Sequence, residues 1–178
     1  MEIFAISGSI RDDSYNFALL KAMAALSPEN MNINVFDNIH NIPIFNPEID
    51  DENLPEPVVD LIAKLRASDG VIISTPEYAH GVPGALKNML DWLVSSDVLT
   101  LKPIVVTSVS TSGLGGVRAY SPLVLILSAM NTHVVIEGSL NIPYAKNKFD
   151  ENNNLQDELT KKAITVSLLV LEQAIYNA

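Results

Sequence analysis

Five short segments of this chain are almost continuously apolar, and stretches with helical spacing separate them. The apolar segments cover residues 2–7, 32–36, 70–74, 103–109 and 133–136. A strand with one face in water alternates apolar and polar residues, whereas a continuous apolar run is typical of a parallel strand that is buried on both faces. This feature constrains the fold most, because parallel strands need long crossover connections, which are usually helices.

The segments between these strands have the apolar spacing of amphipathic helices. Residues 15–26 bring Leu19, Met23 and Leu26 to one face, and Pro28 follows the end of this helix. The other predicted helices cover residues 58–67, 85–94, about 117–130, and 155–176. Five βα units in this order predict a three-layer α/β/α sandwich, with right-handed crossovers. The natural choice for five parallel strands is the flavodoxin-like order 2-1-3-4-5.

Composition indicates one soluble domain over residues 1–178. Hydrophobic residues make up 48% and charged residues 18% of the chain. No apolar run approaches the roughly 20 residues that span a bilayer. The first residues, Met-Glu-Ile-Phe, have no basic region of the kind that begins a signal peptide. We therefore expect a cytoplasmic protein with no membrane partner.

The charge and the metal-ligating residues exclude several functions. With 11 basic and 21 acidic residues the net charge is -10, so no basic footprint for nucleic acid is expected. Cysteine is absent, and His40, His80 and His133 are dispersed, so no metal site is predicted. The Gly-x-Ser-x-Gly elbow of serine hydrolases is also absent.

Two segments leave alternatives open. The connection over residues 37–57 has four prolines and several acids; it is either a solvated acidic loop or a cover for a site or a partner subunit. In the helix near 117–130, Pro122 predicts a start near Tyr120 or a kink. Residues 123–127 are apolar all round, which favours burial in a dimer interface or in the core.

The loop after the first strand has the components of a phosphate-binding cup. Ser14 is a good N-cap for the following helix, and a helix N-terminus binds anions. Gly8 allows a sharp turn, and Arg11 offers a planar donor fork. Ser9 and Asn16 add neutral donors. The alternative is an ordinary capped loop with a surface arginine, but the full set favours phosphate.

The loops after the third and fourth strands could hold a flat ring. Tyr78 and His80 could contact an aromatic ligand, although a loop histidine often only faces solvent. Gly113, Gly115 and Gly116 would let backbone amides approach a ligand edge, or would form a flexible turn. Ligands of open α/β sheets bind outside the carboxyl ends of the strands, so all three loops point to one site.

In these loops the chain resembles the NADPH-dependent FMN reductase family of quinone, azo-dye and chromate reductases. The motifs are Gly-Ser-Ile-Arg-Asp-Asp-Ser-Tyr-Asn at 8–16, Pro-Glu-Tyr-Ala-His-Gly-Val-Pro-Gly-Ala-Leu-Lys-Asn at 76–88, and Ser-Gly-Leu-Gly-Gly at 112–116. The resemblance covers nearly the whole chain. It implies non-covalent FMN, NADPH or NADH as electron donor, and a small acceptor: a quinone, free flavin, azo compound or metal oxyanion. It also implies a homodimer or a tetramer built from dimers.

The resemblance implies a set of cofactor-binding residues and no catalytic side chain, because the flavin carries the chemistry. The phosphate would be held by Ser9, Arg11, Ser14 and Asn16, with Tyr15 in the same motif. The isoalloxazine and ribityl region would be lined by Pro76, Glu77, Tyr78, Ala79 and His80, and the ring edge by Ser112 and Gly113.

One residue departs from the family pattern. Ala79 stands where family members usually have asparagine, so a side-chain amide is lost and FMN binding could be weaker. Two other functions therefore stay open. One is a flavodoxin-type electron carrier, which the arginine of the first loop argues against. The other is an FMN-free member of the fold that binds a partner protein.

Overall fold

The computed structural model describes residues 1–178, apart from the side chain of Asp51. Its strands are β1 (Glu2–Ser7), β2 (Asn32–Phe36), β3 (Gly70–Thr75), β4 (Pro103–Val109), β5 (His133–Val134) and β6 (Leu140–Ile142). All pair in parallel, in the order β2-β1-β3-β4-β5, which confirms the predicted flavodoxin-like topology. β6 is an additional strand that also pairs with β4.

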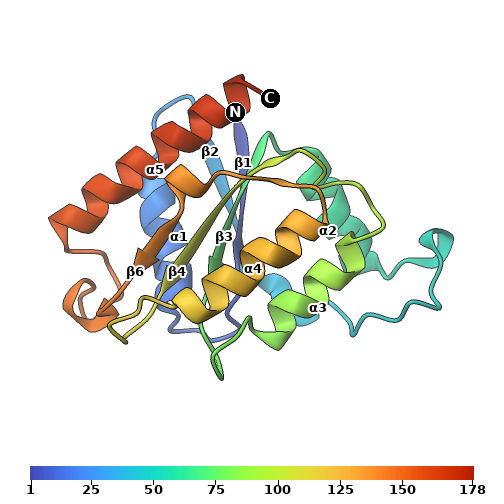
Figure 1. Ribbon diagram of the computed structural model, residues 1–178, viewed down its shortest axis with the longest axis horizontal. Helices are drawn as coiled ribbons and strands as arrows, with labels where there is room; N and C mark the ends of the chain where they lie inside the picture. Colours follow the sequence, from blue (N-terminus) through green and yellow to red (C-terminus); the bar gives the residue numbers. More distant parts are fainter.

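The helices cover both faces of the sheet (Figure 1). They are α1 (Tyr15–Ala25), α2 (Glu56–Arg66), α3 (Gly84–Leu93), α4 (Val117–Ala129) and α5 (Glu158–Tyr176). Short 3-10 helices are η1 (Asn38–Asn41), η2 (Asp51–Asn53), η3 (Ile136–Gly138) and η4 (Ala145–Asn147). Helices α1 and α5 lie over one face, and α2, α3 and α4 lie over the other.

Each central strand feeds two hydrophobic cores. In β1, Phe4 and Ile6 pack under α2 and α3, whereas Ile3 and Ala5 pack under α1 and α5. Successive side chains of a strand point to opposite faces, so a strand between two helical layers must be apolar at every position. Burial on both faces thus accounts for the continuous apolar runs of the central strands.

The predicted fifth strand is wrong in its length. Instead of one strand over 133–136, β5 pairs with the beginning of β4 and β6 with its end. Between them the chain turns through η3, where a side chain on Gly138 would meet Val105 at 2.9 Å and the Ser167 carbonyl oxygen at 3.3 Å. Gly138 thus lies tightly between β4 and α5, and two short strands share this edge of β4.

Two of the predicted helix starts differ from the structure by more than two residues. α5 begins at Glu158 rather than at 155, because Leu155 pairs with Phe149 in a hairpin and Asp157 caps the helix. α4 starts at Val117 and runs through Pro122, so the predicted start near Tyr120 is wrong. Pro122 is exposed, and the carbonyl group that it leaves unpaired can therefore meet water.

The long connection before α2 is fixed to α3 by side-chain hydrogen bonds. Trp92 Nε1 donates to the Pro43 carbonyl oxygen (2.8 Å), and Asn88 Nδ2 donates to the same oxygen (2.9 Å). The Asn88 side-chain oxygen accepts from the Phe45 amide (2.8 Å). This part of the connection thus follows α3 and leaves Ile44 87% exposed.

Candidate functional site

Three loops meet at the carboxyl ends of β1, β3 and β4. They enclose a cavity of about 130 Å³. The residues that line it are Ser9, Arg11, Asp13, Ser14, Tyr15, Asn16, Pro76, Glu77, Tyr78, Val109, Ser110 and Thr111. Eight predicted site residues therefore lie around one cavity, although they are up to 69 positions apart in the chain.

The first loop presents hydroxyl groups and the N-terminus of α1. Ser14 is the N-cap, and its oxygen accepts from the Phe17 amide (3.4 Å). Its hydroxyl hydrogen remains available to a ligand, as do the first amides of the helix. No acidic residue lies in the first turn of α1, and the exposed Arg11 lines the rim. This donor set suits a phosphate group.

Asn16 is a buried connector between three elements of the site. Its side chain is 3% exposed. Its amide donates to the Val109 carbonyl oxygen (3.1 Å), and its oxygen accepts from the Ser74 hydroxyl and the Val109 amide (3.0 Å each). Asn16 thus holds the start of α1 against the ends of β3 and β4, which gives the cup its shape.

Ser9 connects the first loop to the second. Its hydroxyl lies 3.3 Å from the Tyr78 hydroxyl and accepts from the Arg11 amide (3.2 Å). Ser9 is 5% exposed and Tyr78 is 43% exposed, and both line the cavity, so the pair connects the buried wall of the cavity to its open side. The position of the backbone that carries Arg11 depends on this contact.

The second loop ends in a two-residue hairpin turn. Tyr78 and Gly81 exchange two backbone hydrogen bonds (3.3 and 3.0 Å), and the residues between them, Ala79 and His80, have φ of 48° and 60°. Both are thus left-handed, a conformation that Asn-Gly pairs prefer in such turns. Ala79 and His80 are exposed and lie outside the 130 Å³ cavity.

Arg118 on α4 holds this hairpin. Its Nη1 lies 2.8 Å from His80 Nε2, and its backbone amide donates to Glu77 Oε2 (3.1 Å). Gly116, the N-cap of α4, has no side chain to bond the helix amides, so Glu77 satisfies one of them instead. The second and third loops are thereby joined at the mouth of the cavity.

The third loop lines the cavity with residues other than the predicted ones. Ser110 and Thr111 line the cavity, whereas the predicted Ser112 and Gly113 do not. Ser110 and Thr111 follow β4 directly, and this position at the carboxyl end of a strand is the sequence feature that could have identified them. Gly116 has φ of 83°, and a side chain there would collide with Ser108, so it serves a tight turn rather than ligand approach. Tyr144 lies against Gly113.

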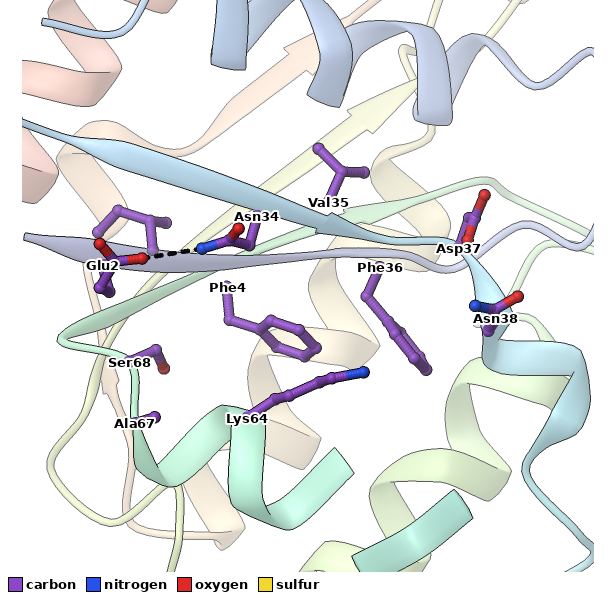
Figure 2. Close-up of a pocket in the computed structure, with 11 residues that line it drawn as sticks. Glu2, Phe4, Asn34, Val35, Phe36, Asp37, Asn38, Lys64, Ala67 and Ser68 are labelled. Atoms are coloured by element: carbon purple, nitrogen blue, oxygen red, sulfur yellow. Dashed lines mark hydrogen bonds between the residues drawn. The ribbon is translucent and has the colours of Figure 1, made fainter. Parts of the chain in front are cut away.

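A separate cavity of about 370 Å³ lies along β2, the edge strand next to β1 (Figure 2). The rings of Phe4 and Phe36 lie between β2 and Lys64 of α2. Glu2 closes one end, where its carboxylate accepts from Asn34 (2.9 Å). None of the predicted site residues lines this cavity.

Among the described residues, no group of three or more histidine, cysteine, aspartate or glutamate residues could hold a metal ion. Over the same part of the chain, no helix is both long and apolar enough to cross a bilayer.

The sheet order defines a flavodoxin-like α/β protein, and the cup at the start of α1 has donors that suit a phosphate group. The family model described as NADPH-dependent FMN reductase matches residues 1–147. The chain therefore belongs to the NADPH-dependent FMN reductase family. It is an oxidoreductase whose cofactors are FMN and a nicotinamide nucleotide.

Relatives agree with this assignment along nearly the full chain. A quinone reductase of Escherichia coli is 29% identical over 179 residues, covering 98% of this chain and 95% of its own. An NADH-dependent flavin reductase subunit of Lactobacillus johnsonii is 33% identical, with 94% and 93% covered. The structure of FerB, a flavoenzyme NAD(P)H:(acceptor) oxidoreductase from Paracoccus denitrificans, has the same fold, with a TM-score of 0.89, 24% identity, and 99% and 97% covered.

Proposed function

We propose that this protein oxidises NAD(P)H and passes the electrons through bound FMN to a small acceptor. The observation that carries the proposal is the 130 Å³ cavity, where the N-terminus of α1 meets the loops after β3 and β4. An anion-binding cup beside two further loops suits a ligand with a phosphate at one end and a flat ring at the other.

The chain's own residues have distinct roles in this proposal. Ser9, Ser14 and Arg11 bind the phosphate, and Asn16 holds the three elements in place. The segment from Pro76 to Tyr78 and the pair Ser110 and Thr111 flank the remainder of the ligand. FMN supplies the ability to accept a hydride from the nucleotide and to return two electrons to the acceptor.

Ala79, His80, Ser112 and Gly113 contribute at the entrance rather than inside the cavity. Their exposure suits contacts with the outer edge of the ring and with molecules that approach it. The Arg118–His80 contact keeps the hairpin in one position there. Loss of the asparagine amide at position 79 thus need not remove the phosphate-binding cup.

The direct test is the visible spectrum of purified protein that has been saturated with FMN and freed of excess. We expect a bound flavin band that NADPH or NADH bleaches and that air restores. A bound flavin that neither nucleotide bleaches would favour the electron carrier. Protein that retains no flavin would refute the proposal and favour the FMN-free alternative.

Quinones are the acceptor class that we favour. The Escherichia coli relative is named a quinone reductase, and a Burkholderia relative, 29% identical over 165 residues, is named a 2-hydroxy-1,4-benzoquinone reductase. Steady-state rates with a benzoquinone, free FMN, an azo dye and chromate test this choice. A benzoquinone kcat/KM below that of any other acceptor would contradict it.

A cytoplasmic location and a single domain remain predictions.

We also propose a homodimer that uses the layer of α3 and α4. These two helices lie next to each other on one face of the molecule (Figure 1). On this layer Leu125 is 72% and Val94 62% exposed, and Ile44, on the connection fixed to α3, is 87% exposed. Leu123 and Leu127 are buried in the core, so only one side of the apolar α4 segment is available to a second subunit.

A further inference from the structure

A second cavity adjoins the predicted phosphate cup on the side of β2. It holds about 520 Å³, and Ser9 and Arg11 line both cavities. Its other walls come from the loop after β1, from Phe17 of α1, and from the segment that follows β2. A ligand that extends beyond the proposed FMN phosphate on the side of β2 would enter this second cavity.

Asp37 is the residue that gives this cavity its chemistry. It follows β2 directly and lines the cavity together with Asn38 and His40. It stands at the N-cap position of η1, but its side chain makes no capping hydrogen bond. Figure 2 shows the Asp37 side chain and Val35 on one side of β2, opposite the ring of Phe36. Asp37 thus lies at the boundary between the apolar cavity of Phe4 and Phe36 and the second cavity, and it lines both.

The position of Asp37 has a known physical use in α/β proteins. A carboxylate at the end of the second strand, beside the first βα loop, can accept hydrogen bonds from the hydroxyls of an adenosine ribose. β1, α1 and β2 have that arrangement here, with β2 adjacent to β1. Ile10 and Phe17 supply apolar surface on which a flat base can lie. The first loop lacks the Gly-x-Gly-x-x-Gly sequence that accompanies such a carboxylate in dinucleotide-binding folds. In the proposed function the N-terminus of α1 instead binds the flavin phosphate.

The charges in the cavity distinguish NADH from NADPH. Asp12 and Asp37 both line it, whereas Arg11, the guanidinium in its wall, is shared with the predicted flavin phosphate. A carboxylate accepts from a free ribose 2′-hydroxyl but repels a 2′-phosphate, so the same side chain attracts one nucleotide and rejects the other.

We infer that this cavity binds the adenosine half of the nicotinamide nucleotide, that Asp37 holds the ribose hydroxyls, and that the enzyme therefore prefers NADH. This inference rests on the proposed function, because it identifies the electron donor of that site. Asp37 is a specificity-determining residue in this scheme and does not contact the reacting atoms.

The test uses the FMN-loaded protein and ADP-ribose, which has the adenosine half of NADH but no nicotinamide. Calorimetry should detect ADP-ribose binding, and Asp37→Asn should weaken it about tenfold or more, the effect of losing a hydrogen bond to a charged group. ADP-ribose with a 2′-phosphate should bind more weakly than ADP-ribose to the wild type, and Asp37→Asn should reduce that difference.

The control is Glu29→Gln, which removes the same charge from an exposed residue before the amino end of β2. It should leave ADP-ribose binding unchanged, and neither variant should change FMN affinity. No ADP-ribose binding, equal binding by Asp37→Asn, or tighter binding of the 2′-phosphate form would each overturn the inference. Failure of the proposed function is distinguishable, because there neither NADH nor NADPH bleaches the flavin, whatever calorimetry gives.

Discussion

At the scale of single residues, side chains of similar type have different tasks in the site. Ser14 and Asn16 both come from one motif, but only Ser14 has a hydroxyl hydrogen free for a ligand. The Asn16 oxygen accepts two protein hydrogen bonds, and its amide donates a third. The sequence identifies both residues, because both follow the first strand. It does not show which of them can bind a ligand and which joins elements of the protein. That distinction depends on Ser74 and Val109, which are far along the chain.

Arg11→Ala should weaken FMN binding by about 1.5–3 kcal/mol, the range for a hydrogen bond to a charged group. Arg11 is the cation that lines the cup in a chain of net charge -10, so other residues cannot easily replace it. Fluorescence titration of the apoprotein with FMN measures the change. Lys162→Ala, which removes an exposed positive charge on α5, is the control. Equal FMN affinity of the Arg11 variant and the wild type would remove Arg11 from the cup.

At the scale of elements, the loops and caps determine how the site is held. The hairpin over residues 78–81 has two left-handed residues with side chains, Ala79 and His80. Each costs about 1–2 kcal/mol relative to a residue that adopts this conformation freely. The contact between His80 and Arg118 offsets part of that cost. The sequence shows Ala-His between Tyr78 and Gly81, but only the structure shows that both residues have positive φ.

The double substitution Ala79→Asn with His80→Gly should raise the free energy of unfolding of the apoprotein by about 1 kcal/mol. Asn-Gly is the pair that suits this turn, and the gain in backbone energy exceeds the loss of an exposed side-chain contact. Urea unfolding measures the change. Arg118→Gln, which removes only the contact with His80, should be slightly destabilising. A destabilised double variant would show that the Arg118 contact, rather than the backbone, dominates.

Asp157, the N-cap of α5, should make the free energy of unfolding depend on pH in the acid range. Hydrogen bonds from the Thr160 hydroxyl (2.5 Å) and Lys148 Nζ (3.0 Å) to the Asp157 carboxylate lower its pKa from 3.8 to about 2. A lowered carboxyl pKa stabilises the fold above the unfolded-state value, and that contribution is lost as pH falls from about 4 through 2. The wild type should therefore lose its advantage over Asp157→Asn within this interval.

Unfolding free energies of the wild type and Asp157→Asn, measured between pH 7 and pH 2, test this expectation. Asparagine can still cap the helix, so the difference isolates the charge. Glu151→Gln, an exposed acid in the preceding hairpin, should show a smaller pH-dependent difference. A constant difference between the wild type and Asp157→Asn over the whole interval would contradict the assignment.

At the scale of the whole molecule, the two hydrophobic cores explain why the sequence predicts the sheet. The sequence does not predict which sides of the surrounding helices face solvent. Strand residues are apolar on both faces because helices cover both. On α4, however, the five consecutive apolar residues look equivalent in the sequence, and the structure buries Leu123 and Leu127 while Leu125 is 72% exposed.

Leu125→Asp should convert the proposed dimer into monomers without unfolding the protein. A charge in the centre of an apolar interface is costly to desolvate, whereas an exposed position in a monomer tolerates it. Sedimentation equilibrium measures the mass, and circular dichroism shows whether the fold is retained. Leu159→Asp is a matched control, because Leu159 is 75% exposed on α5, away from the α3–α4 layer. A Leu125 variant with unchanged mass would exclude this face as the interface.

The sequence by itself determined the parallel sheet, its strand order, the N-cap Ser14 and the three loops at one edge. These features depend on local spacing and on the burial of both faces of the central strands, so neighbouring positions in the sequence carry the information. Only the tertiary structure decided the division of the last strand into β5 and β6, the left-handed turn at Ala79 and His80, and the cavity beside Asp37. Each of these results from contacts between segments distant in the chain, whose packing no local pattern encodes.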